Sequence, residues 1–497
     1  MKKALAFTLA VLMVLALFAS CGQKDDKPEG QTDSEKQTQE QSTVLETETK
    51  KVEIVPTVVN EKYPDQSFDV LHWWFGEVGD SWIPWEEVHV TDMTGDTMGD
   101  LIYYRSSYVT DHFKTEMSVT YENAENLGNL VKTLVNGGSK EYDLVIQRGV
   151  RLGKIYMDDL FTDLNEIPSV DFTYPWWSTD AVTSMAWGKQ NFFAVSDMLY
   201  LDKGASACVY YNAEIAENHS DAIPDLYKLV NDREWTMERM LEYMEVAAVD
   251  QNDDAKFDGD EDLVGLAVGD DPVHFLYNGA GLKFMSTDSA GYYEFLFNSP
   301  ESIETMTSIF DDFMYSPYLR NTYLTPATVS FFKNNQALFA MGTVKSAIGY
   351  REMLSPYGIL PVPMFDKSQN RYYSEVSPHH DSWMFVLNTV TDLDYLGDIL
   401  ETLNYYSYYN VYNTFYEVVV EGRGTRDQQS RDMLKIVFNN RIYDPGLIYD
   451  ISGFPTIVLR YTKTGLSNFA HLYGEYEGKL EEDIEKINIK IDNSLHS

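Results

Sequence analysis

Strands and amphipathic helices alternate near the start of the folded part of this sequence. Residues 68–74 form an apolar run typical of a strand, and residues 117–121 have the same character. Residues 123–136 carry apolar side chains at helical spacing on one face, and residues 142–146 are another short apolar run. Strands that alternate with amphipathic helices are typical of parallel sheets, so the sequence predicts an open α/β sheet built from βαβ units.

The rest of the chain continues this mixture of elements. Thr236 can cap a helix whose apolar face includes Met240, and Trp235 can pack on that face as a hydrophobic staple. Because 497 residues exceed the about 250–300 that one hydrophobic core holds, we expect two α/β lobes, with the chain crossing between them more than once. Helices are also predicted at 303–313, 393–403, 432–438 and 480–491, and strands at 336–341 and 358–362.

Residues 1–20 have the pattern of an export signal. Lys2 and Lys3 precede the apolar run 4–19, which at sixteen residues is shorter than the about 20 that a membrane span needs. The run leads into Phe18-Ala19-Ser20-Cys21-Gly22, which resembles a bacterial lipobox with Phe18 at a position usually held by Leu. The resemblance implies that Cys21 becomes an acylated, membrane-anchored N-terminus. The alternative is an ordinary cleaved signal followed by an incidental cysteine.

The stretch 21–66 is rich in Gln, Glu, Lys, Thr, Ser and Asp and poor in aromatic residues. Such a composition cannot bury enough apolar surface to fold, so it predicts a disordered, acidic tether. We therefore expect a signal peptide at 1–20, the acylated cysteine and tether at 21–66, and a two-lobed folded body at 67–497. This layout predicts a protein that works at the extracellular face of the cell membrane, held there by lipid.

The charge balance excludes several classes of partner. The chain has 38 Lys and Arg against 78 Asp and Glu, a formal charge of −40, which disfavours nucleic acid and docking of a basic patch on anionic lipid. Only Cys21 and Cys208 are present, so acylation of the first leaves no disulfide within one chain. Cys208 lies in an apolar run and is predicted to be a buried strand residue.

Several short motifs occur in the order seen in the extracellular solute-binding proteins of ABC importers. They are Thr94-Gly95-Asp96 with Asp100 and Arg105, Glu141-Tyr142-Asp143-Leu144-Val145, Trp176-Trp177, Tyr210-Tyr211-Asn212, Pro224-Asp225-Leu226-Tyr227, Trp235-Thr236, Asp258-Gly259-Asp260, Gly279-Ala280-Gly281, Gly358-Ile359-Leu360-Pro361-Val362-Pro363, Arg426-Asp427 and Tyr443-Asp444-Pro445-Gly446. Over nearly all of residues 68–455 the chain thus resembles the large, sugar-type (family 1-like) class found as lipoproteins in Gram-positive bacteria. The resemblance implies a periplasmic-binding-protein-like fold of type II, with a ligand cleft between hinged lobes. It also implies a monomer whose partners are a small solute and the ABC permease subunits in the membrane.

Aromatic side chains are the main candidates for solute contact. They cover the C–H face of a sugar, while carboxylates, amides and guanidinium groups bond the hydroxyl rim. Trp73 and Trp74 lie at the carboxyl end of the first predicted strand, where open α/β sheets bind ligands. Strand alternation sends their side chains to opposite faces, so we expect one of them to contact solute. The alternative is that both pack in the core or between the lobes.

The resemblance adds three further candidates from other segments. Trp383 precedes the apolar run 384–387, in a region from which the family commonly takes a cleft aromatic. Asp197 falls where the second lobe contributes polar groups, and Tyr277 precedes a glycine-rich turn. Four further tryptophans, Trp176, Trp177, Trp187 and Trp235, are expected to be packing residues.

An acidic segment carries the oxygen ligands of a calcium loop. An EF-hand loop uses side chains at positions 1, 3, 5, 9 and 12 and a carbonyl at position 7. Ala255 stands where such a loop has its turn-forming glycine, and the alternative is a solvated acidic turn. A structural Ca²⁺ is the one metal or cofactor that the sequence suggests. The candidate ligands are Asp250, Asn252, Asp254, Asp258 and Glu261, with the Lys256 carbonyl at position 7.

These features favour three functions to different degrees. The favoured one is capture of a mono- or oligosaccharide for an ABC transporter. A second is a ligand-sensing or adhesive lipoprotein on the same fold, which the tyrosine-rich stretch 405–409 leaves open. An exported glycoside hydrolase is disfavoured because abundant carboxylates alone identify no catalytic pair, and the sequence has no H-E-x-x-H or G-x-S-x-G motif. We therefore predict a protein that is not an enzyme.

Overall fold

The computed structural model describes residues 53–74, 85–257, 261–269, 271–321, 327–420, 428–464 and 469–496. Ile54–Ser497 forms one compact unit. The predicted signal peptide, Cys21 and the tether up to residue 52 lie outside the described residues. Within the described ranges, no helix has the length and apolarity that a membrane crossing requires.

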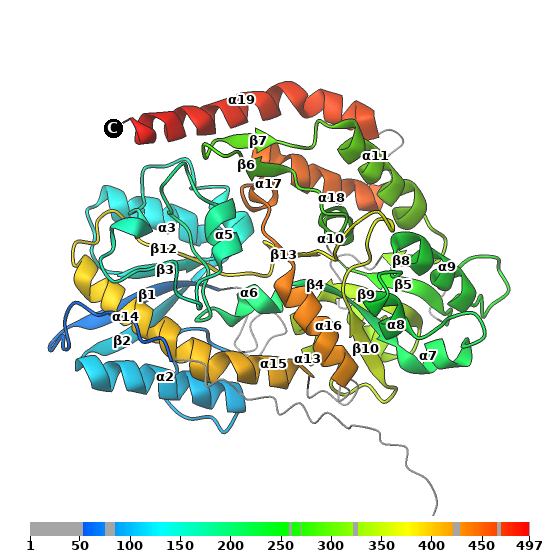
Figure 1. The fold of residues 1–497 in the computed structure, drawn as a ribbon, viewed down its shortest axis with the longest axis horizontal. Coiled ribbons are helices and arrows are strands. Elements are labelled where there is room, and N and C mark those ends of the chain that lie inside the picture. The colour runs from blue at the N-terminus through cyan, green and yellow to red at the C-terminus, as the bar shows by residue number, and fades with distance from the viewer. Residues whose placement is uncertain are drawn as a thin grey trace, which may run out of the picture. The chain divides into compact units, whose positions relative to one another are not determined.

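The first sheet has the strand order β12-β3-β1-β2, and we call it and its covering helices the first lobe (Figure 1). β1 runs parallel to β2 and to β3, whereas β12 is antiparallel to β3. Two helices connect the parallel strands, and the side chains of Asp96 and Asn123 cap them by accepting amide protons. The predicted βαβ arrangement is confirmed. The elements are β1 (Ser67–Trp74), α2 (Thr97–Phe113), β2 (Glu116–Asn123), α3 (Ala124–Asn136), β3 (Leu144–Gln147) and β12 (Trp383–Phe385).

The second sheet has the order β10-β4-β9-β5-β8 and forms the second lobe. β5 is parallel to β8 and β9, and β4 is antiparallel to β9 and β10. Cys208 is fully buried in β4, as predicted, and burial raises the pKa of its thiol to about 12. The strands are β4 (Ala207–Asn212), β5 (Val264–Val268), β8 (Leu319–Asn321), β9 (Ala337–Thr343) and β10 (Tyr357–Leu360).

Helices and two small strand pairs complete the body. β6 (Met285–Thr287) pairs with β7 (Tyr293–Phe295), and β11 (Ser374–Glu375) pairs in parallel with β13 (Arg441–Ile442). The remaining helices are α4 (Gly149–Leu152), α5 (Thr179–Ser184), α6 (Tyr200–Gly204), α7 (Ala213–Asn218), α8 (Leu226–Asn231), α9 (Met237–Ala247), α10 (Pro272–Gly279), α11 (Pro300–Ser308), α12 (Ala327–Lys333), α13 (Ala347–Tyr350), α14 (Leu393–Tyr406), α15 (Tyr412–Val420), α16 (Gln428–Asn439), α17 (Pro445–Ile448), α18 (Phe454–Thr464) and α19 (Phe469–Leu495). Short 3-10 helices are η2 (Leu164–Glu166), η4 (Val344–Ser346) and η6 (Ile451–Gly453), and π-helices are η3 (Ile309–Met314) and η5 (Ser407–Val411).

The chain crosses between the sheets in several segments, as predicted. The first crossing segment, residues 196–206, contains α6 and leads into β4. The second, residues 374–383, contains β11 and leads back into β12; it touches the first where the Ser377 amide donates to the Ala205 carbonyl at 3.0 Å. The third is helical: α14 packs on α2 of the first lobe, α15 packs on both α2 and α13, and η5 joins them. Hinge motion in such a fold is confined to segments of this kind.

The folded body begins earlier than the sequence predicted. The amides of Val59 and Asn60 donate to the Asp398 carboxylate on α14, and the hydroxyl of buried Tyr63 donates to the same carboxylate at 2.7 Å. The predicted tether extended to residue 66, but its last residues pack here because Asp398 offers several acceptors to an otherwise polar stretch. Composition cannot reveal an acceptor that lies more than 300 residues away in sequence.

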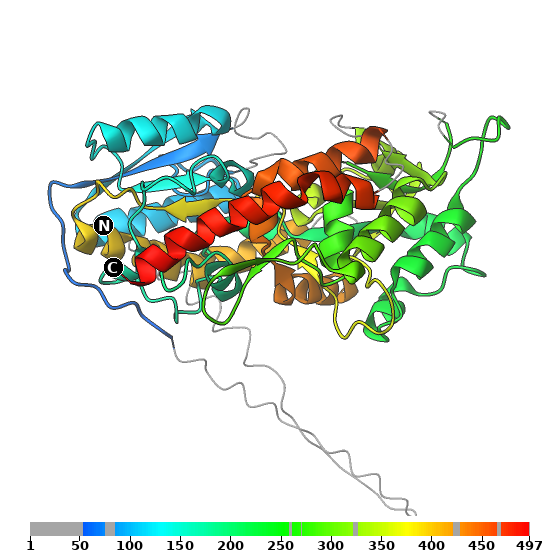
Figure 2. The ribbon, with the colours of Figure 1, turned by 90° about the horizontal axis from the view of Figure 1, so that it is seen from above.

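The C-terminal helix α19 connects distant parts of the body. Figure 2 shows it running along the body, and near its start Phe469 packs on Phe297 with ring centroids 5.3 Å apart. Near its end Lys490 Nζ lies 2.9 Å from Asp159 Oδ1, and Ser494 donates to Gln190. The predicted helix at 480–491 is therefore the second half of a longer one.

Four tryptophans have the packing roles expected of them. The Nε1 groups of Trp176 and Trp177 both donate to the carboxylate of Glu401 on α14. Trp187 Nε1 donates to the Tyr449 hydroxyl at 3.0 Å, and Trp235 Nε1 donates to the Pro361 carbonyl at 2.9 Å. All four side chains are buried, so each indole N–H has the partner that burial demands.

Candidate functional site

The carboxyl ends of the first-lobe strands gather several chemically active side chains at one edge. β1 ends with Trp73 and Trp74, and β3 ends just before Arg148. Because β12 is antiparallel to β3, Trp383 at its start pairs with Gln147 at the end of β3. Chain segments more than 200 residues apart therefore place their side chains at the edge where open α/β sheets bind ligands.

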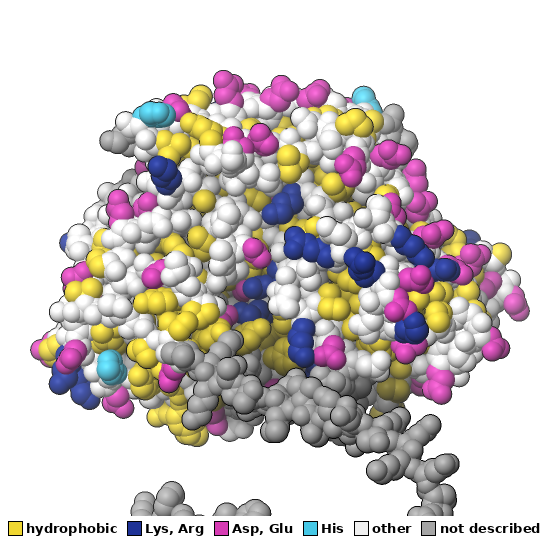
Figure 3. All heavy atoms as spheres, viewed as in Figure 1, with side chains coloured by type: hydrophobic (Ala, Val, Ile, Leu, Met, Phe, Trp, Pro, Cys, Tyr) yellow, Lys and Arg dark blue, Asp and Glu magenta, His cyan; other side chains and the backbone are white. Residues whose placement is uncertain are grey.

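The edge of the second sheet at which β5 and β9 end faces the edge of the first sheet at which β1 and β3 end. Lys345 lies in η4, shortly after the end of β9, and Asp271 lies shortly after the end of β5. Ser377 in the second crossing segment donates to Asp271 Oδ2 at 2.7 Å. The charge of Lys345 interacts with those of Arg148, at the end of β3, and Asp381, in the second crossing segment. We call the group formed by Trp73, Arg148, Lys345, Asp381 and Trp383 the interlobe site. In Figure 3, Lys and Arg side chains occur from the middle to the right of the visible face, and those on the right lie among acidic side chains.

Each indole of the interlobe site is held by a specific polar contact. Trp73 is fully buried, its Nε1 donates to the Ser382 hydroxyl at 3.0 Å, and the Arg148 guanidinium carbon lies 5.7 Å from its ring centroid. Trp383 is also fully buried, and its Nε1 donates to Asp381 Oδ2 at 2.6 Å. Its ring meets that of Tyr443 edge to face, with centroids 5.7 Å apart. Both rings are therefore rigid, preoriented surfaces.

A glycine lets the strand ends approach one another this closely. The Gly149 amide donates to Asp381 Oδ1 at 2.7 Å. A Cβ at Gly149 would lie only 2.9 Å from Asp381 Oδ2 and 3.0 Å from Trp383 Nε1. Any larger residue would push apart the carboxylate and the indole that it orients.

Burial shifts the charges of the interlobe site toward their neutral forms. It lowers the pKa of Lys345 to about 7, although Glu87 and Asp381 oppose the shift. It raises the pKa of Asp381 to about 8, against the hydrogen bonds from Gly149 and Trp383. It also lowers the pKa of Arg148 to about 10, which leaves that guanidinium charged at neutral pH. These buried polar groups gain from a ligand that supplies hydroxyls, because a polar group removed from water requires hydrogen-bond partners.

Three other predicted residues lie in different surroundings. Asp197 forms an ion pair with Lys203 inside the first crossing segment, and Lys203 Nζ lies 4.5 Å from the Tyr412 ring centroid. Asp197 thus lies beside the hinge rather than in the second lobe. Trp74 is half-buried and packs on Tyr121 with centroids 5.0 Å apart, on the strand face opposite to Trp73, as alternation predicts.

Tyr277 does not join the interlobe site. It is fully buried on α10 between Phe284 and Phe297, at centroid distances of 5.0 and 5.4 Å. The sequence suggested Tyr277 because it precedes a glycine-rich turn. On α10, however, its ring points into an aromatic core. We therefore leave Tyr277 out of the solute site.

Sequence reasoning missed Arg148, Lys345, Asp381 and Glu87. Arg148 directly follows β3, and Lys345 lies shortly after β9. Because ligands bind at the carboxyl ends of strands in open α/β sheets, the positions of these two residues could have been recognised from the sequence. Asp381 lies in the same loop as Trp383, two residues before it. Glu87 has no such signal, because its position depends entirely on tertiary contacts.

The acidic loop keeps some features of a calcium site. The Asp250 carboxylate accepts the amide of Ala255 at 2.8 Å, and Ala255 has a φ of +63°, the left-handed conformation that favours glycine. Asp258 lies outside the described residues. In the part of the chain that is described, no three His, Cys, Asp or Glu side chains converge to hold a metal ion. The calcium site, with Asn252, Asp254 and Glu261 as further ligands, stays a prediction.

A hollow with an empty volume of about 680 Å³ lies elsewhere on the second lobe. It is lined by apolar residues of α9 and η3 together with Glu238 and Asp312. None of the predicted solute-binding residues lines it. The interlobe site remains the stronger candidate.

Comparison with known proteins places the fold. No protein-family model matches the sequence, and no curated protein matches it. Among solved structures, the maltose/maltodextrin-binding domain MalE from Bdellovibrio bacteriovorus, bound to maltotriose, is 14% identical, with 87% of this chain and 100% of that chain covered and a TM-score of 0.50. The GacH receptor of Streptomyces glaucescens, solved without ligand and with acarbose, is 11% identical, with 83% and 99% covered and a TM-score of 0.52.

A third solved structure is also similar to this chain. The galacto-N-biose/lacto-N-biose I-binding protein of the ABC transporter from Bifidobacterium longum, in complex with lacto-N-biose, is 11% identical. The match covers 85% of this chain and 97% of that chain, with a TM-score of 0.53. At such identities the likeness concerns the fold. The chain therefore has the two-lobed α/β fold of these solved structures, which is the fold that the sequence predicted.

Proposed function

We propose that the chain is a membrane-anchored solute-binding protein that captures an extracellular mono- or oligosaccharide for an ABC transporter. Acylated Cys21 holds it at the outer face of the cell membrane, and the residues that follow act as a tether. The folded body works as a monomer, performs no covalent chemistry and passes its solute to the permease subunits.

The observation that carries this proposal is the pair of indoles at the point where the two sheets meet. Trp73 and Trp383 offer flat apolar faces, and Arg148, Lys345 and Asp381 offer donors and acceptors beside them. A sugar needs this combination of an aromatic platform and a polar rim. Because both indoles are fully buried, a solute can reach them only when the edges separate at the crossing segments. The sugars named in the similar structures support the same ligand class.

Calorimetry of the full-length chain against saccharides tests the proposal. The panel contains maltotriose, lacto-N-biose, acarbose and common monosaccharides, with short peptides as the contrasting class. We expect one saccharide to bind, and Trp383→Ala to weaken it at least tenfold because the platform is lost. Trp187→Ala is the matched control, since it removes another buried indole ring that lies outside the interlobe site. If calorimetry detects binding of a peptide and of no saccharide, the sugar assignment is refuted.

Membrane attachment has its own test. Cys21→Ser removes the predicted acylation site, and we expect the chain to move from the membrane fraction to the culture medium. Mass spectrometry of the wild-type N-terminal peptide should find acyl groups on Cys21. Retention of the variant on membranes would contradict the lipid anchor without affecting the solute site.

A ligand-sensing or adhesive lipoprotein is the second candidate, and one surface feature favours it. Tyr406 and Tyr409 at the junction of α14 and η5 are half-buried, and the exposed Tyr108 packs on Tyr406 with centroids 5.2 Å apart. Such a tyrosine-rich surface suits protein contact. Uptake of radiolabelled saccharide separates the two functions: deletion of the gene abolishes uptake for an importer and leaves it unchanged for a sensor.

A further inference from the structure

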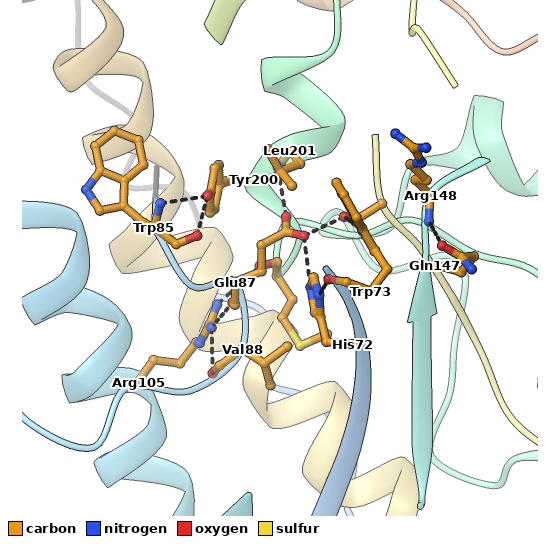
Figure 4. Close-up of polar contacts among 12 residues, drawn as sticks. His72, Trp73, Trp85, Glu87, Val88, Arg105, Gln147, Arg148, Tyr200 and Leu201 are labelled. Atoms are coloured by element: carbon orange, nitrogen blue, oxygen red, sulfur yellow. Dashed lines mark hydrogen bonds and ion pairs between the residues drawn. The ribbon is translucent and has the colours of Figure 1, made fainter. Parts of the chain in front are cut away.

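The carboxylate of Glu87 joins three segments that are far apart in sequence. It is fully buried, and its Oε1 accepts the Leu201 amide of the first crossing segment at 2.9 Å. Its Oε2 accepts the Ser382 hydroxyl of the second crossing segment at 2.5 Å. His72 Nε2 of β1 lies 3.3 Å from the same oxygen. Figure 4 shows the carboxylate at the centre of these contacts.

The guanidinium of Arg105 on α2 binds the backbone of the same region. Its Nη2 donates to the carbonyls of Glu87 and Val88, the latter at 2.8 Å. Its Nη1 donates to the Met198 carbonyl of the first crossing segment at 3.3 Å and to the Ser407 hydroxyl of η5 at 2.8 Å. Burial lowers the pKa of Arg105 to about 10, so the group stays charged and its hydrogen bonds are charge-assisted.

This network reaches an indole of the interlobe site. Trp73 Nε1 donates to the Ser382 hydroxyl, and that hydroxyl donates to Glu87. The ring of Trp73 is thereby linked through Ser382 and Glu87 to the Leu201 amide, and through the backbone at Glu87 to Arg105 and η5. All three crossing segments thus contact Glu87 or Arg105.

We propose that Glu87 and Arg105 are positioning residues that couple Trp73 to the crossing segments, so that solute contact at Trp73 stabilises the arrangement in which the two edges meet. The part of this inference that involves solute rests on the proposed function; the link between the network and the lobe arrangement does not. When the edges separate, Trp73 and the crossing segments move together because one carboxylate holds both.

A label pair on the two lobes tests the coupling without any ligand. In the Cys21→Ser background, Asn129→Cys on α3 and Leu354→Cys near α13 place spin labels at exposed positions of opposite lobes, and the native Cys208 is buried. Electron-spin distance measurements on the full-length chain then report the lobe arrangement. We expect Ser382→Ala and Glu87→Gln to shift the label distances to longer or broader distributions. Ser382→Ala changes no charge, so it remains informative if Glu87→Gln fails to fold.

Glu401→Gln is the matched control. Glu401 is also a buried carboxylate that accepts indole N–H groups, from Trp176 and Trp177; it lies on α14 of the third crossing segment, but none of its hydrogen bonds reaches Glu87, Arg105 or Ser382. We expect this variant to lose stability and keep the wild-type label distances. The proposal is overturned if Ser382→Ala and Glu87→Gln keep the wild-type distances, or if Glu401→Gln alters them equally.

A double-mutant cycle with maltotriose, or with the saccharide that the panel identifies, tests the solute part. Trp73→Phe keeps the ring and removes the N–H, and Ser382→Ala removes its partner. Each should weaken binding by about tenfold, the value of a buried hydrogen bond in a charge-linked chain, and the double variant should lose no more than either. Independent, additive losses would overturn the coupling. If no saccharide binds the wild type, the proposed function fails, while the ligand-free distances still decide the network.

Discussion

Glu375 provides a sharp test of the electrostatics beside the hinge. Its side chain on β11 is 1% exposed, and neither carboxylate oxygen has a hydrogen-bond partner in the structure. Burial raises its pKa well above the ordinary value of 4.5, and the neighbouring charges of Asp271, Asp444 and Asp381 raise it further. We therefore predict that Glu375 is protonated in the folded protein at neutral pH, and that Glu375→Gln stabilises the fold.

The expected size follows from proton linkage. The folded state keeps a proton that the unfolded chain releases above about pH 4.5, so wild-type stability falls as the pH rises toward the folded pKa. One such group changes the free energy of unfolding by about 1.4 kcal/mol per pH unit. For a body of about 440 residues, an unfolding entropy of about 2.1 cal/mol/K per residue converts this to about 1.5 °C in Tm per pH unit.

Differential scanning calorimetry between pH 4 and 8 measures the effect. Glutamine has the shape of the protonated side chain and no proton to lose, so the two proteins should have similar Tm values near pH 4.5. Above that pH the variant should become progressively more stable than the wild type. A constant difference across the range, or a variant that is less stable at pH 7, would show that the carboxylate is charged and partnered, and the reasoning would be wrong.

Three further outcomes follow from other buried or acidic groups. Glu401→Gln should lower the free energy of unfolding by about 2 kcal/mol or more, because the amide nitrogen that replaces one carboxylate oxygen cannot accept the N–H groups that Trp176, Trp177 and the Asp171 amide donate to both oxygens; a Tm unchanged within about 1 °C would contradict this. Cys208 should react with a thiol reagent only in urea, since burial raises its pKa to about 12; rapid reaction of the native protein would argue for an open second lobe. If the acidic loop binds Ca²⁺, saturating calcium should raise Tm relative to chelator, and Asp250→Asn should abolish the rise; equal Tm values in both buffers would exclude the site.

The local sequence pattern was sufficient to predict most of the helices and strands of the first lobe. The helix at 123–136 and its flanking strands appear with boundaries shifted by only a few residues, because an apolar face at helical spacing and a capping Asn123 act within one segment. Packing tryptophans were also recognised correctly. Tyr277 shows the limit of such reasoning, since nothing in the residues around it reveals that Phe284 and Phe297 enclose its ring.

The candidate site depended on contacts between distant segments. Sequence alone identified Trp73 as a strand-end residue and Trp383 as a loop aromatic, but not that Ser382 would receive the first indole and Asp381 the second. It also gave no role to Glu87, whose carboxylate reaches Leu201 and Ser382 only after the chain has crossed between the lobes.

The sequence by itself therefore determined the alternation of strands and helices, the burial of apolar segments and the acidic character of the surface. These properties depend on near neighbours and composition, which short-range patterns encode. Only the tertiary structure decided which charges face one another, which indoles meet and where the folded body begins. Those features depend on the strand order and on the antiparallel pairing of β12 with β3. Both bring together residues that are separated by hundreds of positions in the sequence. The energy of a buried charge is set by such neighbours, so its chemistry emerges only from the assembled fold.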